Sequence, residues 1–164
     1  MKKFLKFSFY GIIYLIIIFF LAVMFIATAK AEIVKPNNGI EPYQVVKIQL
    51  RGLMKNNQPV KDHGIKQTWE FAHPNNQKNT GPLSNFIKML KGESYKMLLN
   101  HLEHEIIELK LTNSAAFYQV TVMDDEKNYY RFNWKVEKYI KDGPLKDCWL
   151  TTMVSAPIAL GSSI

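Results

Sequence analysis

The clearest structural pattern in the sequence is a strict alternation of side chains over residues 130–136, YRFNWKV. Apolar side chains occupy every second position of this run, and Arg131, Asn133 and Lys135 stand between them. Successive side chains of a β-strand point to opposite faces, so the run predicts a strand with one apolar and one polar face. We expect the apolar face to pack on the core of the protein.

Three neighbouring stretches continue the same period. Alternation or β-rich composition marks residues 107–111, 117–123 and 148–154 as further strands. Turn-forming residues separate the strands at 112–114, 124–128 and 142–144. Because strands joined by short turns are antiparallel neighbours, the second half of the chain predicts an antiparallel meander of four strands.

The first half of the body has helical spacing instead. Pro42 is well placed to open a helix, and an apolar stripe follows it until residues 56–59. Asp62 can cap a second, shorter helix that stops before Pro74. Residues 75–79 then read as a polar loop.

A third helix begins at Pro82 and ends at Gly92, with apolar residues at full amphipathic spacing, and residues 94–99 add one short turn. Helices followed by a meander predict an α+β domain in which the N-terminal helices pack on a curved four-stranded sheet. We place this domain at residues 42–157, after a linker at 32–41 that contains Pro36 and Gly39 and before a tail at 158–164.

The N-terminal 31 residues have the composition of a targeting segment. Residues 7–29 carry no charge, and their length is sufficient for a membrane-spanning helix. The small residues of ATA at 27–29 and AKA at 29–31 also fit the cleavage site of a secretory signal. The length favours an uncleaved anchor, and the small residues favour a cleaved signal peptide, so both readings stay open.

The charge distribution predicts an orientation for this segment. Of the 21 basic residues, Lys2, Lys3, Lys6 and Lys30 lie in the first 31 positions, where there is no acidic residue. By the positive-inside bias, we expect the N-terminus in the cytoplasm and the body outside it, either anchored in an inner membrane or free in the periplasm after cleavage. The body carries 17 basic and 14 acidic residues without a basic cluster, which argues against a nucleic-acid partner.

The densest group of potential ligands is His101, Glu103, His104 and Glu105. On a strand, His101, Glu103 and Glu105 would share one face and His104 the other. A third or fourth metal ligand at a recognised spacing is missing from the sequence, so we predict no metal and no cofactor, and we interpret the group as a solvated or hydrogen-bonded strand edge. Cys148 is the single cysteine, and we interpret it as a small buried side chain.

Several segments of the body resemble an uncharacterised bacterial and plastid domain family of unknown function. Members of that family carry a YEFASPxNRxxTGP run and a short GCWMTD strand. In this chain Leu102 and Asp147 depart from the family pattern, which has arginine and glycine there. The resemblance covers residues 42–157 and rests on residues 69–76 (WEFAHPNN), 80–83 (TGPL), Phe86, 89–90 (ML), Tyr95, 98–101 (LLNH), 147–154 (DCWLTTMV) and 156–157 (AP).

The resemblance implies a nuclear transport factor 2-like cone, also called a cystatin-like α+β fold, and it implies no established activity. We therefore carry two hypotheses of function. The first is a membrane-tethered or exported, non-catalytic module that binds a small apolar ligand or a partner protein. Its candidate ligand-binding residues are Asn76, Thr80, Phe86, Tyr95, His101, Trp134 and Trp149.

The second hypothesis is a small-molecule enzyme of the cone type, with His101 or Glu103 as a base inside a pocket. Histidine is favoured for this role because general bases work best with a pKa near the operating pH. The aromatic stripe of residues 130–134 could line such a pocket or simply fill the core. Homodimerisation through the outer face of the sheet is a further expectation, and it comes from the resemblance alone.

Overall fold

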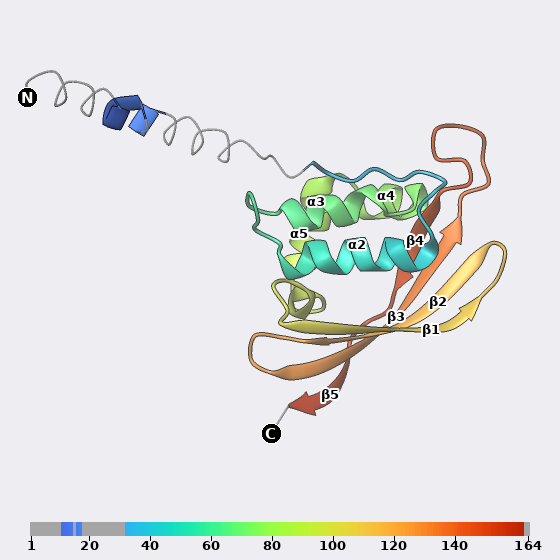
Figure 1. Cartoon of the computed structure of the whole chain (residues 1–164). Coiled ribbons are helices and arrows are strands. Elements are labelled where there is room, and N and C mark those ends of the chain that lie inside the picture. The colour runs from blue at the N-terminus through green and yellow to red at the C-terminus, as the bar shows by residue number, and fades with distance from the viewer. Residues whose placement is uncertain (1–10, 15, 18–31, 163–164) are drawn as a thin grey trace, which may run out of the picture. The chain divides into compact units, whose positions relative to one another are not determined.

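The alternating run lies in β3 (Asn128–Lys138), the strand on which the sheet is built. Figure 1 shows the computed structural model of the chain, in which the antiparallel sheet twists beneath and beside the helices. In β3 the side chains of Phe132, Trp134 and Val136 are buried, as the alternation predicts. The structure thus confirms the α+β class and the packing of N-terminal helices on an antiparallel sheet.

Two strands flank β3 on one side. β2 (Ala115–Met123) pairs with it along its whole length, from Ala115 opposite Glu137 to Met123 opposite Tyr129. β1 (Glu103–Leu111) pairs with β2 and begins four residues before the predicted start, with a register irregularity between Glu108 and Lys110. These hydrogen-bonded pairs form the meander that the turn residues predict.

The other edge of β3 is shared by two short strands, so the predicted four-stranded sheet is wrong by one strand. β4 (Trp149–Val154) pairs with the end of β3, and β5 (Ile158–Ser162) pairs with its start. Between them, Ser155 bonds Asn133 in both directions: its Oγ accepts from the Asn133 N–H at 2.9 Å, and its own N–H donates to the Asn133 carbonyl at 2.9 Å. The predicted tail at 158–164 therefore contains a strand. Its sequence, IALGS, has no polar residue between the apolar ones, so it lacks the alternation that marks β3.

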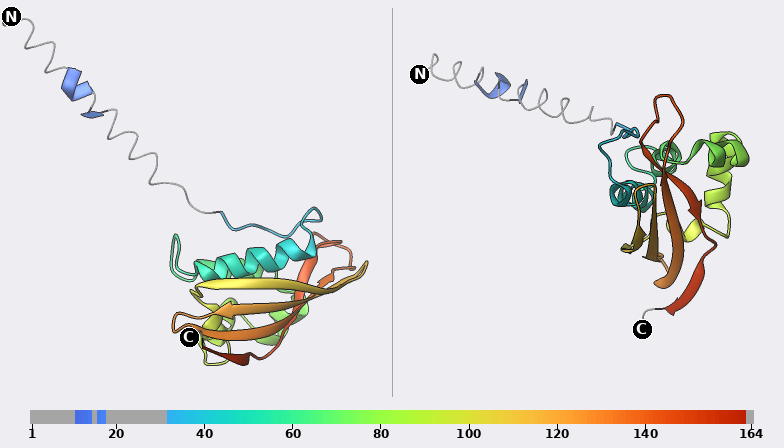
Figure 2. Two further views of the ribbon diagram at one scale, coloured as in Figure 1. Left: turned by 60° about the horizontal axis from the view of Figure 1, so that its bottom comes forward. Right: turned by 90° about the vertical axis from the view of Figure 1, so that its right-hand side faces the viewer.

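The helices follow the predicted order. α2 (Pro42–Met54), α3 (His63–Glu70) and α5 (Leu83–Lys91) correspond to the three expected helices, and the short turn is a 3₁₀ helix, η1 (Lys96–Leu98). Both views of Figure 2 show the helices in relation to the strands, and the left view shows α2 running alongside β1. The buried side of α2 packs on the inner face of β2 and β3 to form one core.

Residues 75–79 are not the predicted loop, because they belong to a fourth helix, α4 (Pro74–Thr80). The sequence of α4 is wholly polar and rich in asparagine, which gives no apolar stripe. Bonds to other elements stabilise this helix instead: Gln77 Nε2 donates to the Trp69 carbonyl at 2.9 Å, and Asn76 Nδ2 donates to the Thr151 carbonyl at 3.1 Å. At its N-terminus the His73 Nδ1 accepts from the Asn75 N–H.

Asp62 occupies the predicted cap position of α3 but does not cap the helix. Its backbone is left-handed, with φ of 61°, and its side chain accepts no bond from the helix N–H groups. The carboxylate pairs instead with the Lys91 Nζ at 2.8 Å, and this bond holds the pKa of Asp62 below its usual range. An ion pair between α3 and the end of α5 thus replaces the expected cap.

The structure describes residues 11–14, 16–17 and 32–162, and the chain divides into two units, Met1–Glu32 and Ile33–Ile164. The described residues before 32 are helical. The predicted leader at 1–31 and its apolar segment at 7–29 otherwise lie outside the described residues. Within the described part of the chain, no helix has the length and apolarity that crossing a membrane requires.

Residues 32–41 contain no helix or strand, and part of this segment lies against α3. Val34 exchanges two bonds with the Gln67 side chain: its N–H donates to Oε1 at 2.8 Å, and its carbonyl accepts from Nε2 at 2.9 Å. Lys35 pairs with Glu70 at 2.7 Å. The folded body therefore begins before Pro42.

The contact between α2 and α3 depends on Gly64. A β-carbon at Gly64 would lie 1.9 Å from the Gly52 carbonyl oxygen, a backbone atom that cannot move aside alone. We predict that Gly64→Ala lowers the free energy of unfolding by about 2 kcal/mol, because the helices must separate. Urea denaturation of the full-length chain measures this change. Gly39→Ala, which would meet only the Asn37 side chain, is the matched control, and an equal loss in both variants would contradict the prediction.

Candidate functional site

A cavity of about 290 Å³ lies between the helices and the end of the sheet. Residues of α2, α3, α4 and α5 form its walls on the helical side, and β3 and β4 close it on the other. The lining consists of uncharged side chains. They are Gln49, Leu53, Thr68, Trp69, Ala72, Asn76, Asn79, Thr80, Phe86, Met89, Leu90, Tyr95, Leu98, Trp134, Thr151, Thr152, Met153 and Val154.

Aromatic side chains give the cavity its apolar character. The rings of Trp69 in α3 and Phe86 in α5 lie 5.0 Å apart between centroids, so the two helices meet through a ring pair. Trp134 of β3 is buried on the opposite wall, and Tyr95 lies half-buried before η1. Aromatic faces bury a large apolar area with little conformational freedom, which suits a preformed binding site.

A hydrogen-bonded network lies at the buried base of the cavity. Thr151 Oγ1 donates to the Gln49 Oε1 at 2.6 Å and accepts from the Trp134 Nε1 at 3.2 Å. Gln49 Nε2 in turn donates to the Thr68 carbonyl at 3.1 Å. The network links α2, α3, β3 and β4, and it satisfies polar groups that would otherwise be costly to bury.

The backbone of Thr151 adds three further bonds to the same place. Its N–H donates to the Phe71 carbonyl at 2.8 Å, and its carbonyl accepts from the His73 N–H at 2.9 Å and from the Asn76 side chain at 3.1 Å. Ala72 and Thr151 thereby form an isolated parallel bridge. This bridge fixes the start of α4 against β4 and positions Asn76 at the cavity.

Five of the seven predicted ligand-binding residues line this one cavity. They come from four separate segments of the chain and are Asn76, Thr80, Phe86, Tyr95 and Trp134. His101 and Trp149 do not line it. Trp149 is buried at the start of β4, where the Lys138 Nζ lies 5.2 Å from the centre of its ring. Gln49 and Thr151, which organise the base of the cavity, were not predicted, because only tertiary pairing brings them together.

His101 is buried and has partners for both of its ring nitrogens. Nδ1 lies 2.7 Å from the Leu98 carbonyl, which can only accept, so Nδ1 carries the proton of the neutral ring. Nε2 then accepts from the His104 Nδ1 at 2.8 Å. The prediction that His101 shares a face with Glu103 is wrong, because His101 precedes β1 and the chain bends at Leu102, between the two residues.

Both histidines have lowered pKa values. Burial lowers the pKa of His101 from 6.5 to about 4, because the charged form loses its hydration. Burial also lowers the pKa of His104, and the cations of Arg51 and Lys47 on α2 add to that effect. The pair therefore lies neutral between α2 and β1, outside the cavity.

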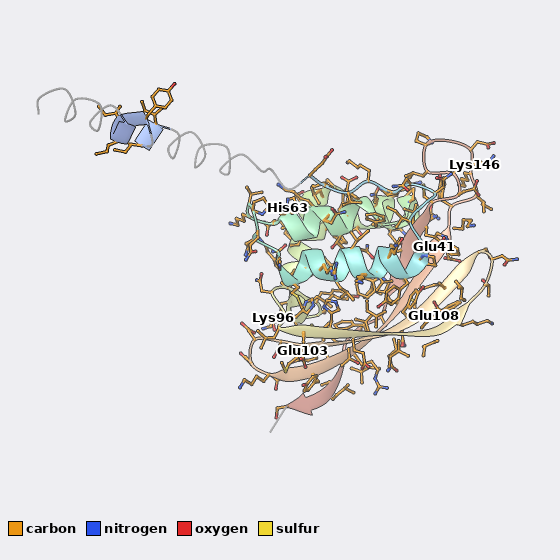
Figure 3. All side chains as sticks on the ribbon, in the orientation of Figure 1. Glu41, His63, Lys96, Glu103, Glu108 and Lys146 are labelled. Atoms are coloured by element: carbon orange, nitrogen blue, oxygen red, sulfur yellow. The ribbon has the colours of Figure 1, made fainter. Side chains whose placement is uncertain are left out.

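Glu103 lies on the other face of the sheet. Its side chain is exposed, and its Oε1 accepts from the Tyr129 hydroxyl at 3.0 Å. Figure 3 labels Glu103 near the start of β1 and Glu108 farther along the same strand. Of the predicted ligand cluster, His101 and His104 are joined by a hydrogen bond, and Glu103, His104 and Glu105 line a separate pocket at the start of β1.

The single cysteine and the potential metal ligands are the other candidate reactive groups. Cys148 is buried, as predicted, and burial raises the pKa of its thiol, which disfavours the nucleophilic thiolate. Within the described ranges, no group of three histidine, cysteine or carboxylate side chains has an arrangement that could hold a metal ion.

The network at the cavity base yields a stability prediction. Thr151→Val removes the hydroxyl and leaves the Trp134 N–H and the Gln49 oxygen without this partner in a buried place. We expect the free energy of unfolding to fall by about 2 kcal/mol. Chemical denaturation measures it, with Thr121→Val on the outer face of β2 as the matched control. Equal stability of Thr151→Val and the parent chain would show that the network contributes nothing.

The histidine pair yields a pH prediction. Because the folded pKa of His101 lies below 6.5, the unfolded chain binds more protons between pH 6.5 and about 4, and stability falls as the pH falls through this window. We expect the His101→Gln variant to lose less stability over that window than the parent chain. Thermal unfolding at a series of pH values tests this difference. A His101→Gln variant that loses as much stability as the parent chain over this window would contradict the prediction.

The chain was also compared with known proteins. Neither the models of protein families, nor the curated proteins, nor the solved structures contain a match to this chain. The resemblance to the uncharacterised domain family, with its cone fold, therefore stays a prediction.

Proposed function

We propose that the chain is a non-catalytic binding module that holds a small, mainly apolar ligand in the cavity between its helices and β4. The observation that carries this proposal is the convergence of Trp69, Phe86, Tyr95 and Trp134 on one cavity with a satisfied polar base. Ligand sites in proteins are typically concave and apolar, with a few placed polar groups. A filled core would leave no such space.

The size of the cavity limits its occupant. An engineered apolar cavity of about 150 Å³ holds one benzene molecule. The volume here, about 290 Å³, is roughly twice that, so it suits a ligand with the bulk of two fused rings or of a short alkyl chain. A protein partner could insert a single aromatic or aliphatic side chain into the same space.

A binding role is favoured over catalysis by the placement of the candidate bases. His101 is bonded at both ring nitrogens and Glu103 lies on the outer face of the sheet, so neither contacts the cavity. A general base must reach the proton that it removes from the substrate. The polar side chains at the cavity base already bond one another, so they are not positioned to transfer a proton to or from a bound molecule. This supports binding of a ligand without a reaction.

The cellular location in this proposal is inferred from the N-terminal segment. Its uncharged stretch at 7–29 and the lysines before it support a body displayed outside the cytoplasm, tethered to an inner membrane or released into the periplasm. Homodimerisation stays a separate expectation.

Native mass spectrometry tests the proposal. We expect the full-length chain, extracted from its own membrane, to carry a small molecule that Thr80→Trp excludes, because the indole would occupy the cavity. Lys78→Trp adds the same ring to the exposed side of α4 and should keep the ligand. A ligand-free mass for the parent chain, or equal retention by both variants, would count against the cavity as the binding site.

A further inference from the structure

We infer that the ligand is electrically neutral and that its polar group lies at α4, near Asn79 and Thr80. This inference rests on the proposed function and specifies the chemical class that the cavity accepts. Within the described part of the chain, the residues that line the cavity include no lysine, arginine, histidine, aspartate or glutamate. A charged group that loses its water there would meet no opposite charge.

Most of the polar groups at the base of the cavity are already bonded to one another. The Thr151 hydroxyl and the Trp134 N–H bond each other, and the hydroxyl hydrogen is directed to Gln49. The Gln49 amide donates to the Thr68 carbonyl. A carboxylate or an ammonium group would have to break this network to gain one bond, so this end suits the apolar part of a ligand.

The mouth of the cavity is different. Asn79 and Thr80 stand at the end of α4, and their side chains make no hydrogen bond within the described residues. Asn76 uses its Nδ2 on the Thr151 carbonyl, which leaves its Oδ1 as an acceptor. An amide, a hydroxyl and an amide oxygen can both donate to and accept from a neutral hydroxyl, carbonyl or amide of a ligand.

Two sets of matched probes test the charge of the ligand. One set is naphthalene methanol, naphthoate and naphthylmethylammonium, and the other is decanol, decanoate and decylammonium. Binding to the full-length chain is followed at neutral pH by the change in the intensity and wavelength of tryptophan fluorescence, since Trp69 and Trp134 line the cavity. A Trp149→Phe background removes the tryptophan that does not line the cavity.

We expect at least one alcohol to bind about tenfold or more tightly than its acid and its amine. Acid or amine binding as tight as that of the alcohol would overturn the neutral class and leave the proposed function standing. If no probe of either set binds, and native mass spectrometry finds the same bound mass in Thr80→Trp and the parent chain, both the proposed function and this inference are wrong.

A charge introduced at the rim gives a second test. Met89 lines the cavity from α5 and is 39% exposed, so Met89→Lys can fold with its ammonium near water. This variant should bind naphthoate about tenfold more tightly than the parent chain, with the alcohol little changed. Ser84→Lys places the same charge on α5 outside the lining and should have no effect. Equal responses of the two variants would contradict the uncharged character of the site.

The position of the polar group is tested separately. The double variant Asn79→Ala, Thr80→Ala should bind naphthalene methanol several-fold, up to about tenfold, more weakly and bind unsubstituted naphthalene as before. Equal losses for both probes would mean that α4 contributes only shape, and no loss for either would place the polar group elsewhere.

Discussion

The bonds of Thr151 are the constraint on which the rest of the structure depends. This one residue of β4 contacts the α3–α4 junction through its backbone and reaches Gln49 and Trp134 through its hydroxyl. The sheet and the helices are thereby fixed at a set separation, with polar groups satisfied on both sides. The hydrogen bonds of Thr151 hold β4 and the helices together at this point. The space next to these bonds is enclosed by side chains but not filled by them, and this space is the cavity.

Local periodicity was sufficient to predict the parts of the fold whose stability comes from one apolar face. The alternation in β3 and the stripes of α2 and α5 are of this kind. α4 and β5 lack such a face: α4 is polar throughout and is bonded to Trp69 and Thr151, and β5 is exposed along its length. Five of the predicted ligand-binding residues do meet, but the network at the cavity base arises only when residues 102 positions apart come together.

The structure separates its ionisable groups from its cavity. The buried histidine pair lies between α2 and β1, Glu103 and Glu105 are exposed on the other face of β1, and the cavity wall presents aromatic rings and amides. Catalysis by a protein base requires such a group next to the bound molecule. The arrangement here supports the proposed binding role, in which shape and a neutral polar contact would select the ligand.

The two hydrogen bonds between Val34 and Gln67 determine which helix first receives a force applied to the N-terminal segment. They join the chain to α3 eight residues before the first helix of the body, and the ion pair of Lys35 with Glu70 adds a third link. Tension applied to the N-terminal side would therefore reach α3 before it reaches α2. Thr68 and Trp69 of the same helix line the cavity. A force on the N-terminal segment and a ligand in the cavity would therefore both act on α3.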